Sequence, residues 1–130
     1  MSDQTLTSEI KKFLNDYTSA FALVDGAAIA RCYHAPSITM RDDGSVHVLE
    51  TRQQLEAFFQ AVAQKYFDEG RQNARFSDLA LQPIGSKSVL ATMQWQQIRA
   101  DGSVIHSWWQ SYNLIYVDGR WQIFASTFHI

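Results

Sequence analysis

The sequence predicts an α+β fold in which three N-terminal helices pack on a mainly antiparallel sheet. Apolar residues recur at helical spacing through the first 70 residues, and from residue 73 onward they alternate with polar ones. Asp-Gly pairs between the later apolar runs are a strong hairpin signal. A sheet with one apolar face has to bury that face, so we expect the helices to cover it. The 130 residues predict one domain, spanning residues 1–130.

The first helix is expected at about residues 8–24, where the apolar residues fall on one side and lysines and aspartate on the other. A short second helix follows Asp25, because this carboxylate can accept hydrogen bonds from the free backbone N–H groups of the next turn. Pro36 is expected to end this second helix.

A short hairpin and the third helix come next. The hairpin strands are expected at 37–41 and 46–49, on either side of a polar turn. Thr51 with Gln54 three residues later forms a capping-box pattern that starts the third helix. Gly70 is the expected end of that helix.

Four strands are expected in the second half of the chain, at about 73–82, 88–99, 104–117 and 120–129. They form an antiparallel meander, because tight turns join them. A two-residue turn between the first pair would put Leu79 and Leu81 on the outer face, so we expect a bulge or a longer turn there.

Two-residue Asp-Gly turns in the rest of the meander predict the register of its last three strands. Trp95 then lies opposite Trp108, which in turn lies opposite His129. One face of this sheet is mostly apolar but carries a polar minority near one end. Buried polar groups need partners, so this mixture predicts a pocket. The candidate pocket residues on these strands are Met93, Trp95, Trp108, Gln110, Tyr112, Thr127 and His129.

The histidines of this face have several interpretations. His106 and His129 are expected to be diagonal neighbours, but the face carries no carboxylate, so we predict no metal site. His129 is a candidate general base, because the ordinary pKa of histidine lies near neutrality. The alternative is a histidine at the pocket rim that is hydrogen-bonded to water. No phosphate-loop or dinucleotide motif is present, so no cofactor is expected.

The opposite face of the sheet carries an apolar patch. Its members are expected to be Trp109, Ile115, Phe124 and Phe128. An exposed patch of this kind needs a partner, and a two-fold homodimer lets one patch serve both subunits.

Composition excludes several classes of partner. A net charge of -2 leaves no broad cationic surface, so no nucleic-acid partner is expected. No stretch is long and apolar enough for a membrane helix, and the acidic N-terminus is unlike a secretory signal. Cys32 is the only cysteine and cannot form an internal disulfide, which favours a reducing compartment. We therefore expect a cytoplasmic protein without a membrane partner.

The order of elements resembles the nuclear transport factor 2-like superfamily, which includes ketosteroid isomerases and polyketide-cyclase-like proteins. Three segments carry the resemblance: residues 17–26, residues 32–40 and the Val-Asp-Gly-Arg-Trp-Gln-Ile run at 117–123. The resemblance implies a cone-shaped fold, with a curved sheet around the helices and a pocket inside. It also places Tyr17 and Arg41 among the pocket residues. Phe21 and Phe59, on the apolar sides of the first and third helices, are further pocket candidates.

Laid against the isomerases, Tyr17 matches the tyrosine that donates a hydrogen bond to the developing oxyanion. The position of the isomerase carboxylate falls on Arg41, which cannot accept a proton at neutral pH. Steroid isomerase activity is therefore not expected. If Arg41 faces the pocket, as the resemblance implies, it selects an anionic ligand.

Three hypotheses for function remain open at this point. The first is a pocket for a small hydrophobic or aromatic ligand, anionic if Arg41 faces inward, with isomerase-, cyclase- or lyase-like chemistry. The second is a ligand-binding protein without turnover. The third is an association module whose task is dimerisation.

Overall fold

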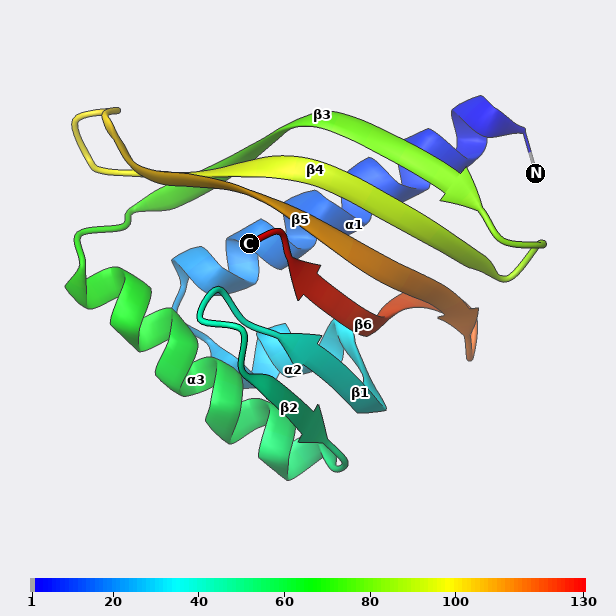
Figure 1. Ribbon diagram of the computed structural model, residues 1–130, viewed down its shortest axis with the longest axis horizontal. Helices are drawn as coiled ribbons and strands as arrows, with labels where there is room; N and C mark the ends of the chain where they lie inside the picture. Colours follow the sequence, from blue (N-terminus) through cyan, green and yellow to red (C-terminus); the bar gives the residue numbers. More distant parts are fainter. Residues whose placement is uncertain (1) are drawn as a thin grey trace.

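The computed structural model describes residues 2–130 and forms an α+β fold with one curved sheet (Figure 1). The helices are α1 (Asp3–Ala22), α2 (Gly26–Arg31) and α3 (Arg52–Asp68). The strands are β1 (Tyr33–Met40), β2 (Val46–Leu49), β3 (Asn73–Pro83), β4 (Ser88–Ile98), β5 (Val104–Val117) and β6 (Arg120–Phe128). The predicted fold class is confirmed.

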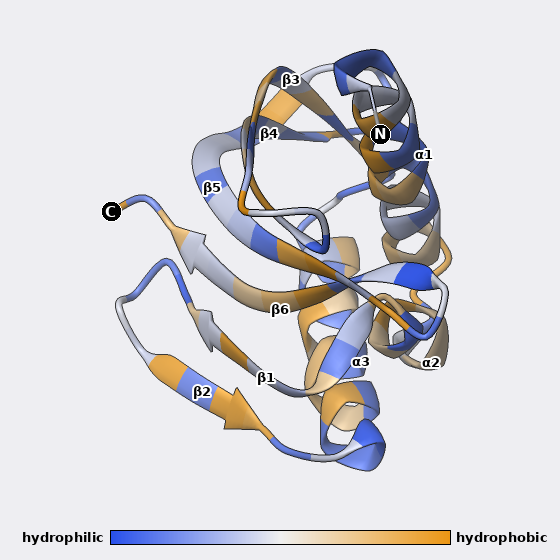
Figure 2. Cartoon of the chain, turned by 90° about the vertical axis from the view of Figure 1, so that its right-hand side faces the viewer, coloured by the Kyte–Doolittle hydropathy of each residue, from blue (hydrophilic) through white to orange (hydrophobic). Residues whose placement is uncertain are grey.

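All six strands belong to one sheet in the order β2-β1-β6-β5-β4-β3. Every neighbouring pair is antiparallel except β1 and β6, which run parallel and join the early hairpin to the later meander. The sheet curves around the three helices, which lie together on one side of it (Figure 2). The core lies between these layers, and no helix within residues 2–130 is long and apolar enough to cross a membrane.

Local capping explains where the helices begin. The Ser2 hydroxyl caps α1, which starts five residues earlier than expected because buried Leu6 extends its apolar side. Asp25 caps α2 as predicted, and Thr51 and Gln54 form the predicted capping box of α3.

The end of α2 was predicted too late. The helix stops at Arg31, before Pro36, and the chain enters β1 at Tyr33. The Arg52 guanidinium, at the start of α3, donates hydrogen bonds to the backbone carbonyls of Ala30 and Tyr33. The first acceptor lies at the end of α2 and the second at the start of β1, so Arg52 links α3 to the junction between them.

The irregularity expected in β3 is confirmed. The register of β3 against β4 shifts between Ser77 and Ala80, and Asp78 adopts a φ of 55°. The shift lets Leu79 and Leu81 pack against the core instead of facing solvent.

A second bulge, in β6, was not predicted. The register of β4 against β5 is as expected from Ser88 to Gln97, with Trp95 opposite Trp108. It shifts next to the turn, where Ile98 pairs with Val104, so the connection is longer than the expected two-residue turn. Between β5 and β6, however, Leu114 pairs with Ile123 and Asn113 with Ala125, which leaves Phe124 as an extra residue. From this point on, the side chains of β6 change faces.

Three of the predicted placements are wrong because of this bulge. Thr127 and His129 lie on the outer face, where the His129 ring nitrogen Nε2 is 2.7 Å from the Ser111 hydroxyl. Phe128, expected on the outer face, points inward and is only 5% exposed. His106 lies opposite Gln97 as expected but is exposed.

Candidate functional site

One pocket lies between α1, the end of α3 and the concave face of the sheet. We call it the central pocket, and its lining residues are Tyr17, Thr18, Phe21, Arg41, Tyr66, Arg71, Ala74, Trp95, Gln97, Trp108, Gln110, Tyr112 and Phe128. Its cavity volume is about 40 Å³. Grooves of about 470 and 650 Å³ lie beside α1, but neither is lined by a buried charged side chain such as Arg71.

Seven of the eleven residues predicted for the pocket line it: Tyr17, Phe21, Arg41, Trp95, Trp108, Gln110 and Tyr112. Phe59 and Met93 are fully buried in the core behind it, so their predicted place in the lining is wrong. Thr127 and His129 lie on the other face of the sheet, as described above.

Six lining residues were missed: Thr18, Tyr66, Arg71, Ala74, Gln97 and Phe128. Two of these could have been predicted from the sequence pattern. Gln97 lies on the predicted inner face of the sheet, and Tyr66 lies on the apolar side of the third predicted helix. Arg71 follows α3 in a short link, where no periodic pattern tells which way a side chain points.

Buried tyrosines form the floor of the pocket. The hydroxyls of Tyr17 and Tyr33 are 2.7 Å apart, and Trp95 Nε1 donates a hydrogen bond of 3.1 Å to the Tyr112 hydroxyl. Burial raises the pKa of Tyr17, Tyr33 and Tyr112 well above 10.0, and their mutual repulsion as phenolates adds to the rise for each of them. All three are therefore neutral at pH 7, and their hydroxyls can donate hydrogen bonds.

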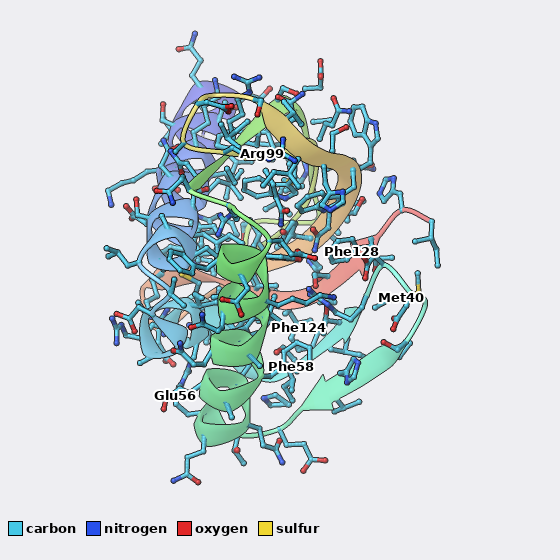
Figure 3. All side chains as sticks on the ribbon, turned by 90° about the vertical axis from the view of Figure 1, so that its left-hand side faces the viewer. Met40, Glu56, Phe58, Arg99, Phe124 and Phe128 are labelled. Carbon is cyan, nitrogen blue, oxygen red and sulfur yellow. The ribbon has the colours of Figure 1, made fainter. Side chains whose placement is uncertain are left out.

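Arg41 reaches into the pocket from the end of β1. Its Nη2 donates a hydrogen bond of 3.3 Å to the Tyr66 hydroxyl. Its guanidinium carbon lies 4.7 Å from the centre of the Phe128 ring and 5.7 Å from that of Phe58, both labelled in Figure 3. Burial lowers the pKa of Arg41, but neighbouring tyrosines, Tyr66 first, outweigh this effect and leave the pKa raised.

Arg71 supplies a second guanidinium and is only 7% exposed. Its guanidinium carbon lies 5.2 Å from the centre of the Phe21 ring and 5.8 Å from that of Tyr66. Burial lowers the pKa of Arg71, yet an arginine remains a cation at neutral pH. Tyr66 thus contacts both arginines of the pocket.

Neither arginine has a carboxylate partner within residues 2–130. The single ion pair in this part of the chain joins Lys12 and Asp16 on the exposed side of α1. None of the residues that line the central pocket is acidic. The pocket therefore holds two positive charges that no acidic side chain neutralises.

Two glutamines complete the polar lining. Gln110 Oε1 accepts a hydrogen bond of 3.0 Å from Trp108 Nε1, which leaves the amide N–H groups of Gln110 available to donate. Gln97 is 1% exposed, and its Oε1 has no hydrogen-bond partner among residues 2–130. An unpaired buried acceptor is costly, so Gln97 Oε1 is a place where a ligand donor would be favoured.

A second depression adjoins the central pocket and shares Tyr66, Gln97, Trp108 and Phe128 with it. We call it the outer depression, and its volume is about 190 Å³. Its remaining residues are Asp42, Lys65, Glu69, His106 and Ser107. The carboxylates and the imidazole that could act as a general base thus lie beside the central pocket rather than in it. No group of three or more metal-ligating side chains occurs within residues 2–130.

Comparisons with known proteins agree with this fold. A family model described as "NTF2-like protein (DUF6841)" matches residues 8–129. The structure of Aln2 from a Streptomyces species has a TM-score of 0.80 and 17% identity, over 99% of this chain and 92% of that chain. No curated protein matches the sequence.

Two further solved structures are similar over most of their length. An NTF-2-like protein of unknown function from Shewanella oneidensis MR-1 has a TM-score of 0.73 and 14% identity, over 94% of this chain and 97% of that chain. An NTF2-like protein with a cystatin-like fold from Novosphingobium aromaticivorans has a TM-score of 0.74 and 9% identity, over 94% and 79%. At these identities the similarity shows the fold alone.

Proposed function

The chain belongs to the NTF2-like protein family, and from this premise we propose that its central pocket binds a small molecule through the hydroxyls of its tyrosine floor. The observation that carries the proposal is the contact between the hydroxyls of Tyr17 and Tyr33 at 2.7 Å. When Tyr33 donates to the Tyr17 oxygen, the Tyr17 proton is free for an acceptor in the pocket. A carbonyl or enolate oxygen of a ligand is such an acceptor.

Isomerase-, cyclase- or lyase-like turnover would need a base as well as this donor. His129 cannot supply it, because its ring lies on the outer face of the sheet. The nearest candidates are Asp42, Glu69 and His106 in the outer depression. The role that we propose is therefore ligand binding by Tyr17, with any turnover dependent on a ligand that extends from the central pocket into the outer depression.

The tryptophans allow a direct test of pocket binding. Trp95 and Trp108 line the pocket, and both indole N–H groups are hydrogen-bonded there. Trp109 lies on the outer face, and Trp121 Nε1 donates to Glu9 of α1, so these two indoles serve as internal controls. In a ¹H–¹⁵N NMR titration with acetophenone, the indole signals of Trp95 and Trp108 should shift while those of Trp109 and Trp121 stay in place.

Replacing Tyr17 by Phe should weaken acetophenone binding about 5- to 10-fold, because one neutral hydrogen bond is lost. Ethylbenzene, which lacks the carbonyl, is the matched ligand and should bind both proteins equally. An equal loss for both ligands would mean that Tyr17 only packs. If acetophenone moves none of the pocket indoles, the proposed pocket function is wrong.

A second candidate function is association of two copies through the outer face of the sheet. Large apolar side chains are exposed there: Ile38, Val46, Val48, Leu90, Trp109 and Phe124. The first three are neighbours, since Ile38 pairs with Val48 and Val46 lies at the end of the same hairpin, visible as the hydrophobic β2 in Figure 2. Of the four predicted interface residues, Phe128 lies inside and Ile115 is partly buried.

Replacing Trp109, which is 40% exposed, by Glu should convert a dimer into a monomer, because the charge would have to be buried at the interface. Sedimentation velocity at micromolar concentration measures this change. His106→Glu, on the same strand but lining the outer depression, is the control and should leave the dimer intact. A wild-type protein that sediments as a monomer would contradict the association proposal.

A further inference from the structure

We propose that the ligand of the central pocket is a small hydroxycarboxylate with an aromatic body. Its carboxylate would be held by Arg41 and Arg71, and its hydroxyl would donate a hydrogen bond to Gln97 Oε1. This inference rests on the proposed pocket function and names the class of ligand that the same site accepts.

The two arginines of the central pocket are suited to bind a carboxylate. A guanidinium that is removed from water without a carboxylate partner is unfavourable, and among residues 2–130 two such groups lie around Tyr66: Arg71, which is buried, and Arg41, which is partly buried. Aromatic rings lie against both groups, Phe128 against Arg41 and Phe21 against Arg71. Arg41 Nη2 donates to the Tyr66 hydroxyl, and the remaining N–H groups of the two guanidiniums can donate to a planar anion.

Gln97 is suited to accept a hydrogen bond from a hydroxyl of the ligand. Its Oε1 is buried and lacks a donor, and Gln97 lines both the central pocket and the outer depression. An anion alone would leave this acceptor unpaired or repel it. A hydroxyl on the same ligand as the carboxylate satisfies both features of the site at once.

The sizes and the aromatic walls of the two hollows fit a ligand with a small polar end and an aromatic body. The central pocket alone is small, so it suits a carboxylate and a nearby hydroxyl better than a whole ring system. The rings of Trp108 and Phe128 stack at 5.7 Å between centres, with 17° between their planes, and border both hollows. An aromatic group extending into the outer depression would lie against these rings.

Mandelate, phenylacetate and mandelamide form a matched set of probes. Phenylacetate lacks the hydroxyl of mandelate, and mandelamide lacks its charge. Dissociation constants from the indole signals of Trp95 and Trp108 should be at least about 10-fold weaker for mandelamide than for mandelate, because charge-assisted hydrogen bonds are lost. Phenylacetate should be about 5-fold weaker than mandelate, because the bond to Gln97 is lost.

Variants assign the effects to residues. Arg71→Met should weaken mandelate about 10-fold or more and should weaken acetophenone much less, because acetophenone carries no charge for the guanidinium to bind. Gln97→Met should remove the difference between mandelate and phenylacetate. Arg75→Met is the control, because Arg75 is an exposed arginine on β3 that donates to Gln96, and it should change none of these constants.

The comparison of the three probes uses the wild-type protein, so its result does not depend on whether a variant folds. Equal affinity for mandelate and mandelamide would overturn the role of the arginines, and equal affinity for mandelate and phenylacetate would overturn that of Gln97. Inorganic phosphate binding as tightly as mandelate would overturn the carboxylate class. If acetophenone shifts the pocket indoles and mandelate does not, this inference fails while the proposed pocket function stands.

Discussion

Deletion of Phe124 should destabilise the protein by more than about 4 kcal/mol, because it removes the residue that inverts the end of β6. Without the extra residue, the strand cannot keep both Ile123 and Phe128 in the interior. Exposing either of them loses most of the stabilisation that comes from burying a large apolar side chain. A slip of the strand end would also bury Thr127 and His129 and break the 2.7 Å hydrogen bond between the hydroxyls of Thr39 and Ser126.

Phe124→Ala is the matched control for the deletion. It removes the same side chain, which is 42% exposed, but keeps the backbone bulge, so it should cost less than about 1 kcal/mol. Urea unfolding followed by tryptophan fluorescence gives both free energies. Similar losses for the deletion and the alanine variant would show that the bulge does not set the orientation of the β6 side chains.

Raising the pH above 10 should unfold the protein steeply, because three tyrosines are buried as neutral phenols. In the unfolded chain a tyrosine ionises near pH 10, whereas in the folded protein Tyr17, Tyr33 and Tyr112 keep their protons to higher pH. The folded state then binds more protons, so the free energy of unfolding falls as the pH rises. Each tyrosine contributes about 1.4 kcal/mol per pH unit, or about 4 kcal/mol per unit for the three.

Tyr112→Phe separates this effect from general alkaline damage. At pH 7 the variant should be less stable by about 1 kcal/mol, because Trp95 loses its hydrogen-bond acceptor. Above pH 10 its stability should fall less steeply than that of the wild type, by about 1.4 kcal/mol per pH unit, because one buried phenol is absent. The two curves should therefore cross near pH 11. Urea midpoints measured from pH 7 to 11.5 test the slopes. Parallel curves for the two proteins would contradict the contribution of Tyr112.

Local patterns in the sequence determined the fold class and most element boundaries. The capping box of Thr51 and Gln54 involves residues three apart, and the Asp101-Gly102 turn sets the pairing of Trp95 with Trp108 within a few residues of chain. Such signals depend on neighbours that the sequence itself places together. They also predicted a pocket face on the sheet, four of whose seven proposed members, Trp95, Trp108, Gln110 and Tyr112, line the central pocket.

Only the tertiary structure decided which side chains complete the pocket. The bulge at Phe124 lies in a strand held by β5 on one side and by β1, far away in sequence, on the other, so alternation along β6 could not reveal it. Arg71 belongs to no periodic element, and its burial arises from packing against Phe21 of α1. The direction of a side chain follows from local period only while the register is unbroken, and contacts between distant segments determine it everywhere else.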